Sequence, residues 1–469
     1  MQSEMKSTSP AWQALAELCR AAQIEWPGET TLQMDGDDPV LPNQLRIGAV
    51  GAASHAAVGL AAAKLHRIRG GEAQRIAVNV PEAVASLRAS HFLTIDGAKP
   101  KRPWDDMSGF YRVKHDRWIF LHCNFPNLRD RAAALLGCSP ARAEVERACA
   151  AWEGEALETA MHAAGGCAAY VRTMMEWRRT PQHLQASTLP ILEITRIGDA
   201  QAEPLPVAER PLSGVRALDL TRVIAGPACG RSLAEHGADV LKVSRPDLAH
   251  SGLLDIDSGV GKLATYLDFR DPIQAEQFKA LIRTGDVFLQ SYRPGSLASH
   301  GYGPEDIAAI RPGIVVATLS AWGHQGPWSG RRGYDTIVQA ATGVSDLCGN
   351  GSEPAHMPVA ALDYIGGNLL TLGIMTALAR RATEGGSWLV RVSLLQTQQW
   401  LLGQGLLEAA ALKGVSAEIP AEVTAPFMRE VASSDGLVRY LGPVLSMSGT
   451  PLRADRPPVP LGTNPPLWP

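Results

Sequence analysis

The stretch of sequence that decides the fold lies at residues 215–243 and reads VRALDLTRVIAGPACGRSLAEHGADVLKV. It begins with a strand-like run at 215–220, continues into a small-residue segment that predicts a helix over 228–236, and ends with a second apolar run at 238–243. Strands that alternate with helices in this way are typical of a parallel sheet covered by helices. We therefore predict an α/β fold, with an open parallel, nucleotide-binding-like sheet that carries helices on both faces.

The same alternation continues toward the C-terminus, where 286–290 and 313–319 predict further strands. On the N-terminal side, 109–113 and 117–122 read as short β runs beside amphipathic helices, which predicts a smaller α+β domain. We expect five segments: a helical segment with a degenerate partial repeat at 1–95, the smaller domain at 96–200, a linker at 201–212, the α/β domain at 213–410 and an extended Pro-rich tail at 411–469.

Composition excludes several classes of protein. The chain has 469 residues and a formal net charge of −3, without runs of Lys or Arg, so we expect no nucleic-acid partner. The start, MQSEMKSTSPAW, has no signal-peptide pattern, and the most apolar stretch, 48–63, is too short and too weak to span a membrane. Seven scattered cysteines predict neither disulfides nor a metal site. We expect a cytoplasmic protein that binds no metal and no membrane.

Several loops follow the predicted strands and should meet at the carboxyl edge of the sheet. Arg245 ends the second strand, where an arginine suits a ribose phosphate such as that of NADP or the 3′-phosphate of coenzyme A, although it could equally be a solvated surface residue. Lys262, the pair Ser291-Tyr292 and Trp322 lie in the loops that follow. Together they offer cations for phosphates and aromatic faces for a base. The glycines at 226 and 230 lack the G-x-G-x-x-G spacing, which disfavours an NADP oxidoreductase.

Asp363 is the sharpest candidate for catalysis. It follows an apolar run and precedes Gly366-Gly367 and a long apolar helix. An aspartate at the start of a helix is most often only an N-cap. The same position would also favour an ionised carboxylate, and the two glycines would let a bulky substrate approach it. A carboxylate nucleophile needs both features.

These motifs resemble the class III CoA-transferases, the family of formyl-CoA transferase and carnitine CoA-transferase. The resemblance rests on DLTRVIAGPACGRSLAEHGADVLKV, GK…YLDFRDP, YRPG, SAWGHQGPW…RRGYD and ALDYIGG, which follow one another in the family's order over about 215–400. It implies that Asp363 attacks an acyl-CoA and that CoA passes to a carboxylic acid through an aspartyl anhydride and an aspartyl-CoA thioester. It also implies that coenzyme A, as co-substrate, contacts Val223, Ile224, Ala225, Arg245, Lys262, Ser291, Tyr292 and Trp322.

The order of the segments departs from the family. The smaller domain precedes the nucleotide-binding half, and 48–90 looks like a second copy of the helix and strand that normally lead into the smaller domain, with Gly48 or Ala49 opposite Asp363. The repeat Leu60…Gly71 and Ile374…Gly386 supports a duplication with one competent site per chain. The family forms interlocked homodimers, so the resemblance implies a homodimer here, although a fused duplication could complete that arrangement within one chain.

Two other functions stay open. An α-methylacyl-CoA racemase shares this fold, but its motif has a His where Gly333-Tyr334-Asp335 has Tyr, so His324 or His356 would have to replace it. A non-catalytic acyl-CoA-binding protein would explain the shuffled order and the lack of an evident glycine-rich loop over the aspartate. The transferase is the reading that we prefer.

Overall fold

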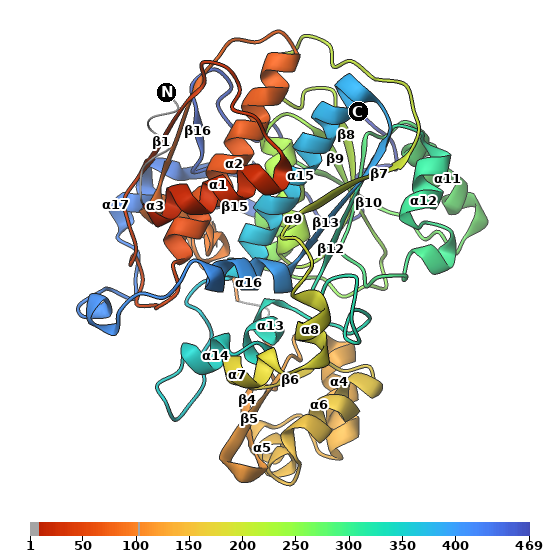
Figure 1. Cartoon of the computed structure of the whole chain (residues 1–469). Coiled ribbons are helices and arrows are strands. Elements are labelled where there is room, and N and C mark those ends of the chain that lie inside the picture. The colour runs from red at the N-terminus through yellow and green to blue at the C-terminus, as the bar shows by residue number, and fades with distance from the viewer. Residues whose placement is uncertain (1–8, 102–103) are drawn as a thin grey trace.

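A seven-stranded sheet lies at the centre of the computed structural model, which describes residues 9–101 and 104–469 (Figure 1). The start of the chain was predicted to have no signal-peptide pattern. Its residues 1–8 lie outside the described residues. In sheet order the strands are β10 (Leu263–Tyr266), β9 (Asp239–Ser244), β8 (Arg216–Leu220), β11 (Val287–Gln290), β12 (Val315–Ser320), β13 (Ser387–Ser393) and β7 (Glu193–Gly198). All neighbouring pairs are parallel except β13 and β7. The prediction of an open parallel sheet in an α/β fold is confirmed.

Helices cover both faces of this sheet, because successive residues of a strand point to opposite faces. Ala217 and Val240 face the core that contains α9 (Ala225–Glu235) and α15 (Ala361–Glu384). Their neighbours in sequence face a second core, formed with α11 (Pro272–Arg283) and α12 (Pro304–Ile310). The remaining helices of this part are α10 (Leu253–Gly259) after β9, η4 (Ala298–His300) after β11, and α13 (Asp335–Ala341) and α14 (Val344–Leu347) after β12.

The N-terminal segment packs against the α9–α15 face (Figure 1). Its elements are α1 (Pro10–Ala22), β1 (Thr31–Asp35), α2 (Ile47–Ile68), β2 (Arg75–Asn79), α3 (Val80–Ser86), η2 (Ala89–His91) and β3 (Thr94–Ile95). Helix α2 lies against α15, and both helices are long and apolar enough to cross a membrane by length and composition alone. However, 89% and 83% of their most apolar windows are buried within the protein, as expected of core helices. Helix α2 is longer than the predicted apolar stretch, because the flanking Lys64 and His66 stay in the same helix.

The smaller domain has its own core. An antiparallel sheet of β4 (Gly109–Val113), β5 (Arg117–Leu121) and β6 (Ala168–Tyr170) packs on three helices, α4 (Pro126–Leu136), α5 (Arg142–Ala150) and α6 (Gly154–Ala163). The short elements η3 (Lys114–Asp116), α7 (Met174–Arg178) and α8 (Pro181–Ala186) complete it. Residues 201–212 have no helix or strand, and the Arg69 guanidinium donates to the carbonyls of Pro206 and Pro211 within them.

The C-terminal part corrects one prediction. Residues 411–469 were expected to be an extended tail, but they contain α17 (Ala421–Thr424), η6 (Ala425–Phe427), and the strands β14 (Met428–Ser433), β15 (Gly436–Leu441) and β16 (Ser446–Met447). Strand β15 pairs with β3 and β16 pairs with β2, so these strands complete sheets of the N-terminal segment. The helices α16 (Leu394–Gly403) and η5 (Ala409–Leu412) precede them. Residues 448–469 lack helix and strand, and the prolines there have no backbone N–H to donate to a ladder.

Candidate active site

Two loops meet where the order of the central sheet reverses. Strands β8 and β11 are neighbours, and the chain runs from β8 out to β10 before it returns to β11. The backbone N–H of Arg222, after β8, donates to Oγ of Ser291, after β11, at 3.2 Å. Open α/β sheets bind ligands in the crevice at this reversal point. The loops after β8 and β11 therefore mark the expected binding edge.

The loop after β8 is strained. Val223 has a φ of 74°, in the left-handed region that a β-branched residue rarely adopts. Gly226, at the second position of α9, closes the same turn against Thr221, whose Cβ would lie 2.3 Å from any added Cβ. Such strain persists only where the surrounding structure holds it, and it concentrates at functional sites.

A buried cluster of charges supports this loop from below. Nζ of Lys262 lies 2.8 Å from Oδ2 of Asp219 and donates to the carbonyl of Pro227 in α9 at 2.8 Å. Nζ of Lys242 lies 3.9 Å from Oδ1 of the same aspartate. Burial alone would raise the pKa of Asp219, but the charges of the two lysines outweigh it and lower that pKa. Lys262 therefore fixes the end of β8 beneath α9.

Asp363 is the third residue of α15, and it does not cap that helix. The N-cap is Ala360, and Oδ2 of Asp335 accepts the backbone N–H groups of Leu362 at 3.0 Å and Asp363 at 3.2 Å. The other oxygen of Asp335 accepts a hydrogen bond from the amide of Gln339. Asp335 and Asp363 are both buried. Two carboxyl groups thus lie at one helix start, and Asp335 takes the free N–H groups.

This arrangement corrects the expectation that Asp363 is readily ionised. Burial raises the pKa of Asp363 well above its ordinary value, and the nearby Asp335 carboxylate raises it further. Burial also raises the pKa of Asp335, to about 6, although its hydrogen bonds with Gln339 and the helix N–H groups oppose this. The helix start that should stabilise the Asp363 anion stabilises the Asp335 anion instead.

Asp363 opens onto a cationic cavity with an empty volume of about 1340 Å³. Four arginines line it, from the loops after β8 and β11 and from the loop before α13, namely Arg222, Arg293, Arg331 and Arg332. Burial and the charges of Arg293 and Arg131 lower the pKa of Arg332. Phe125, Asn127 and Leu128 of the smaller domain also line it. The cavity is therefore suited to a polyanionic ligand.

Asp363 also opens onto a second, more apolar cavity with an empty volume of about 1120 Å³. Trp104, Leu253, Met357 and Val359 line it, with His122 and His356 among them. Burial lowers the pKa of each of these histidines to about 3, so both imidazoles are neutral near neutral pH. The ring of His122 stacks on that of Tyr334 at 3.8 Å between centroids. Val223, Tyr334 and Asp363 line both cavities.

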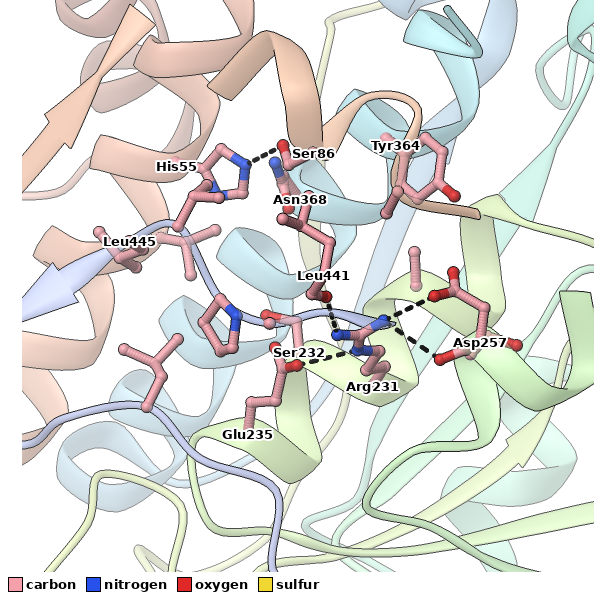
Figure 2. Close-up of a pocket in the computed structure, with 18 of the residues that line it drawn as sticks. His55, Ser86, Arg231, Ser232, Glu235, Asp257, Tyr364, Asn368, Leu441 and Leu445 are labelled. Carbon is pink, nitrogen blue, oxygen red and sulfur yellow. Dashed lines mark hydrogen bonds and ion pairs between the residues drawn. The ribbon is translucent and has the colours of Figure 1, made fainter. Parts of the chain in front are cut away.

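A third cavity lies behind this site, between α2, α9 and α15 (Figure 2). Figure 2 shows the Arg231 guanidinium between Glu235 and Asp257, with N–O distances of 2.8 and 3.1 Å, and Nε2 of His55 lies 2.8 Å from Oγ of Ser86. These polar groups are paired with each other, and Asp363 does not line this cavity. We therefore place no reaction there.

The structure brings together most of the site residues that the sequence predicts. Val223, Ala225, Ser291, Tyr292 and Asp363 line the cationic cavity, and Ile224 lines the apolar one.

Three others, Arg245, Lys262 and Trp322, do not line either cavity, and their direct contact with CoA stays a prediction. The ammonium group of Lys262 forms an ion pair with the carboxylate of Asp219, and the guanidinium of Arg245 forms one with Asp247 at 3.0 Å. Trp322 is buried among Trp177 and Trp328, and its indole N–H donates to the carbonyl of Arg332. It therefore shapes the loop that carries Arg332.

Sequence reasoning missed the four arginines, Asp335 and His122 as site residues. The signal for three of the arginines and for Asp335 is present in the motifs YRPG and RRGYD. Among residues 9–101 and 104–469, no group of three His, Cys, Asp or Glu side chains is placed to hold a metal ion.

Comparison with known proteins gives the family. The model of CoA-transferase family III matches residues 28–207 and 212–444. Human succinyl-CoA:glutarate CoA-transferase is 33% identical over 202 residues, which are 40% of this chain and 46% of that protein. An acyl-CoA transferase of Gibberella moniliformis is 28% identical over 410 residues, 76% of this chain and 71% of that protein. A crystal structure of Rv3272 from M. tuberculosis has a TM-score of 0.38 at 29% identity, covering 41% of this chain and 56% of that one.

Several of these matches are partial. In the first five curated relatives, the matched region spans between 34% and 54% of the relative's own length. The family match, by contrast, takes in both the segment that carries the smaller domain and the segment that carries Asp363. This chain belongs to CoA-transferase family III.

Proposed function

We propose that this protein is a CoA-transferase that moves CoA from an acyl-CoA donor to a carboxylic acid, with Asp363 as the nucleophile. The observation that carries the proposal is the position of Asp363, a single buried carboxyl group that opens onto both a cationic and an apolar cavity. A thioester of CoA joins a polyanion to an acyl group, and its reacting carbon lies between them. The polyanionic part matches the cationic cavity, and the acyl group matches the apolar cavity.

The cationic cavity would hold the CoA moiety. Arginine side chains bind phosphates through paired N–H donors, and four of them line this cavity. Tyr292 offers an aromatic face at the same wall. The apolar cavity, with neutral imidazoles, would hold the acyl group and exclude water from a reactive anhydride.

The reaction is a series of acyl exchanges in which atoms and charges balance. A carboxylate oxygen of Asp363 attacks the thioester carbon, the C–S bond breaks, and CoA leaves as thiolate, which gives an acyl-aspartyl anhydride. The thiolate then attacks the carbonyl carbon of Asp363 and releases the donor acid as carboxylate. The acceptor carboxylate attacks the resulting aspartyl-CoA thioester and displaces the thiolate. Attack of that thiolate on the acceptor carbonyl forms the new acyl-CoA and regenerates Asp363.

We also propose that one chain builds the whole site. Residues of the first matched segment, such as His122 and Phe125, and residues of the second, such as Asp363 and Arg332, line the same two cavities. This favours the fused arrangement over the homodimer that the resemblance implies. The homodimer stays a prediction that a mass measurement in solution can test.

A racemase is the second candidate, because His356 and His122 share the apolar cavity with Asp363. His324 lies elsewhere, 3.8 Å from Glu193. A neutral imidazole could take a proton from the carbon next to the thioester. Its low pKa makes it a weak base for removing that proton, which weighs against this reaction.

The two candidates are separated by one incubation in D₂O with a panel of acyl-CoAs and ¹³C-labelled carboxylic acids. A transferase forms labelled acyl-CoA without exchange at the acyl α-carbon, and Asp363→Asn abolishes this. Exchange of deuterium into the α-carbon without CoA transfer would identify the racemase. CoA binding with neither reaction would identify a binding protein. Asp38→Asn, at another helix start, is the matched control.

A further inference from the structure

The chain contains two versions of the helix that carries the nucleophile. Helices α2 and α15 lie against each other, and each leads through a Gly-Gly pair to a strand. Their N-cap residues have nearly the same backbone, with φ and ψ of −78° and 56° at Arg46 and of −84° and 61° at Ala360. When these caps are matched, Asp363 corresponds to Ala49.

Each helix start receives a carboxylate from another part of the chain. Oδ1 and Oδ2 of Asp38 accept the backbone N–H groups of Gly48 and Ala49, both at 2.8 Å. Asp335 accepts the corresponding pair at the start of α15. The carboxylate cap is therefore common to both helices, whereas the nucleophile is present at only one.

The α2 start has no room for a reaction. A Cβ on Gly48 would lie 2.5 Å from Oδ1 of Asp38 and 2.5 Å from Cγ1 of Val80. At the α15 start, by contrast, Asp363 faces two cavities. Asp38 therefore caps a helix without a neighbouring carboxyl group at the matched position, whereas Asp335 caps a helix that carries Asp363 there.

We propose that Asp335 is a positioning residue that fixes the start of α15 and controls when Asp363 gives up its proton, and that Asp38 performs only the first of these roles. This rests on the proposed role of Asp363 as nucleophile. Asp335 consumes the two N–H groups that would otherwise stabilise the Asp363 anion, and it places a second negative charge beside it. Gln339 holds Asp335 in place, and its Oε1 accepts the backbone N–H of Met357 at 2.8 Å.

Other titratable groups also line the two cavities that Asp363 faces. They are His91, His122, His356, Tyr292, Tyr334, Asp335, Arg222, Arg293, Arg331 and Arg332. Among these described side chains, Asp335 is the only carboxyl group. Its replacement by a neutral residue therefore removes the negative neighbour and leaves the cationic and neutral ones unchanged.

The test is an NMR titration of the protein labelled with ¹³C at aspartate carboxyl groups, with Asp363→Asn and Asp335→Asn used to assign the two signals. In the unmodified protein the two carboxyl groups should titrate in linked steps. In Asp335→Asn the midpoint for Asp363 should fall by about one pH unit or more. In Asp38→Asn it should stay unchanged while the melting temperature falls.

Two results would overturn the proposal: independent one-step titrations of the two groups in the unmodified protein, or the same Asp363 midpoint in Asp335→Asn and the unmodified protein. If Asp335→Asn does not fold, Asp335→Ser keeps an acceptor oxygen without the charge, and the unmodified protein alone still decides between linked and independent steps. The titration needs no turnover. A shifted midpoint without any CoA transfer would therefore refute the proposed function and leave this inference standing.

Discussion

Replacement of Lys262 by methionine should destabilise the protein and leave the residues that line the cationic cavity in place. The side chain is almost fully buried, and its ammonium group lies 2.8 Å from an oxygen of Asp219, which is 0% exposed. Removal of one partner from a buried ion pair costs about 3–5 kcal/mol, because the other charge is left uncompensated. Lys242, 3.9 Å from the same carboxylate, still neutralises part of that charge, so we expect the lower end of this range.

Urea denaturation measures this loss, and calorimetry measures the affinity for CoA on the same samples. The double variant Asp219→Asn, Lys262→Met removes both charges of the pair but leaves the buried Lys242 without its carboxylate, so it should recover only part of the lost stability. Because the folded pKa of Asp219 is lowered, the contribution of the pair is present above the ordinary value of 3.8 and is lost as the pH falls below it. Unchanged stability together with CoA binding weakened tenfold or more in Lys262→Met, not restored in the double variant, would contradict this structural role and support a direct contact between Lys262 and CoA.

Three further predictions concern the site and the assembly. Arg293→Gln and Arg332→Gln should each weaken CoA binding by about 10- to 150-fold at low salt, because each loses a charged hydrogen bond worth about 1.5–3 kcal/mol. Arg147 is exposed and lies outside the cavity, so Arg147→Gln should leave CoA binding unchanged. Equal effects of all three substitutions would contradict the cationic cavity as the CoA site. The rate of CoA transfer should rise with pH as Asp363 loses its proton, with an acid limb well above 3.8, and a limb near pH 4 would show that Asp363 is not held protonated. Light scattering of the active protein should give about the chain mass of 50.0 kDa, and activity that requires a species of twice that mass would support the homodimer instead.

The sheet and the nucleophile helix could be predicted from the sequence because their signals are local. The strands β8, β9, β11 and β12 are short segments rich in apolar residues on both faces, as expected where a parallel sheet is covered on both sides. Asp363 could be located because it lies three residues before Gly366 and Gly367, near the start of a long apolar helix.

The environment of Asp363 could not be predicted, since it depends on contacts between distant parts of the chain. Asp335 lies 28 residues before Asp363 and reaches the helix start only in the folded protein. His122 and Tyr334 stack across the boundary between the smaller domain and the α/β domain. Lys262 looked like a phosphate ligand because a lysine after a strand is usually exposed, but here Asp219 holds it in the core. The pairing of β15 with β3 joins two ends of the chain, which no local pattern indicates.

The most direct test of the central claim is mass spectrometry of the protein after brief incubation with acyl-CoAs and quenching with hydroxylamine or borohydride. We expect a modification that maps to Asp363, forms with at least one donor, and is absent from Asp363→Asn while Asp38→Asn still shows it. A modification at another residue, or CoA transfer that persists in Asp363→Asn, would show that Asp363 is not the nucleophile.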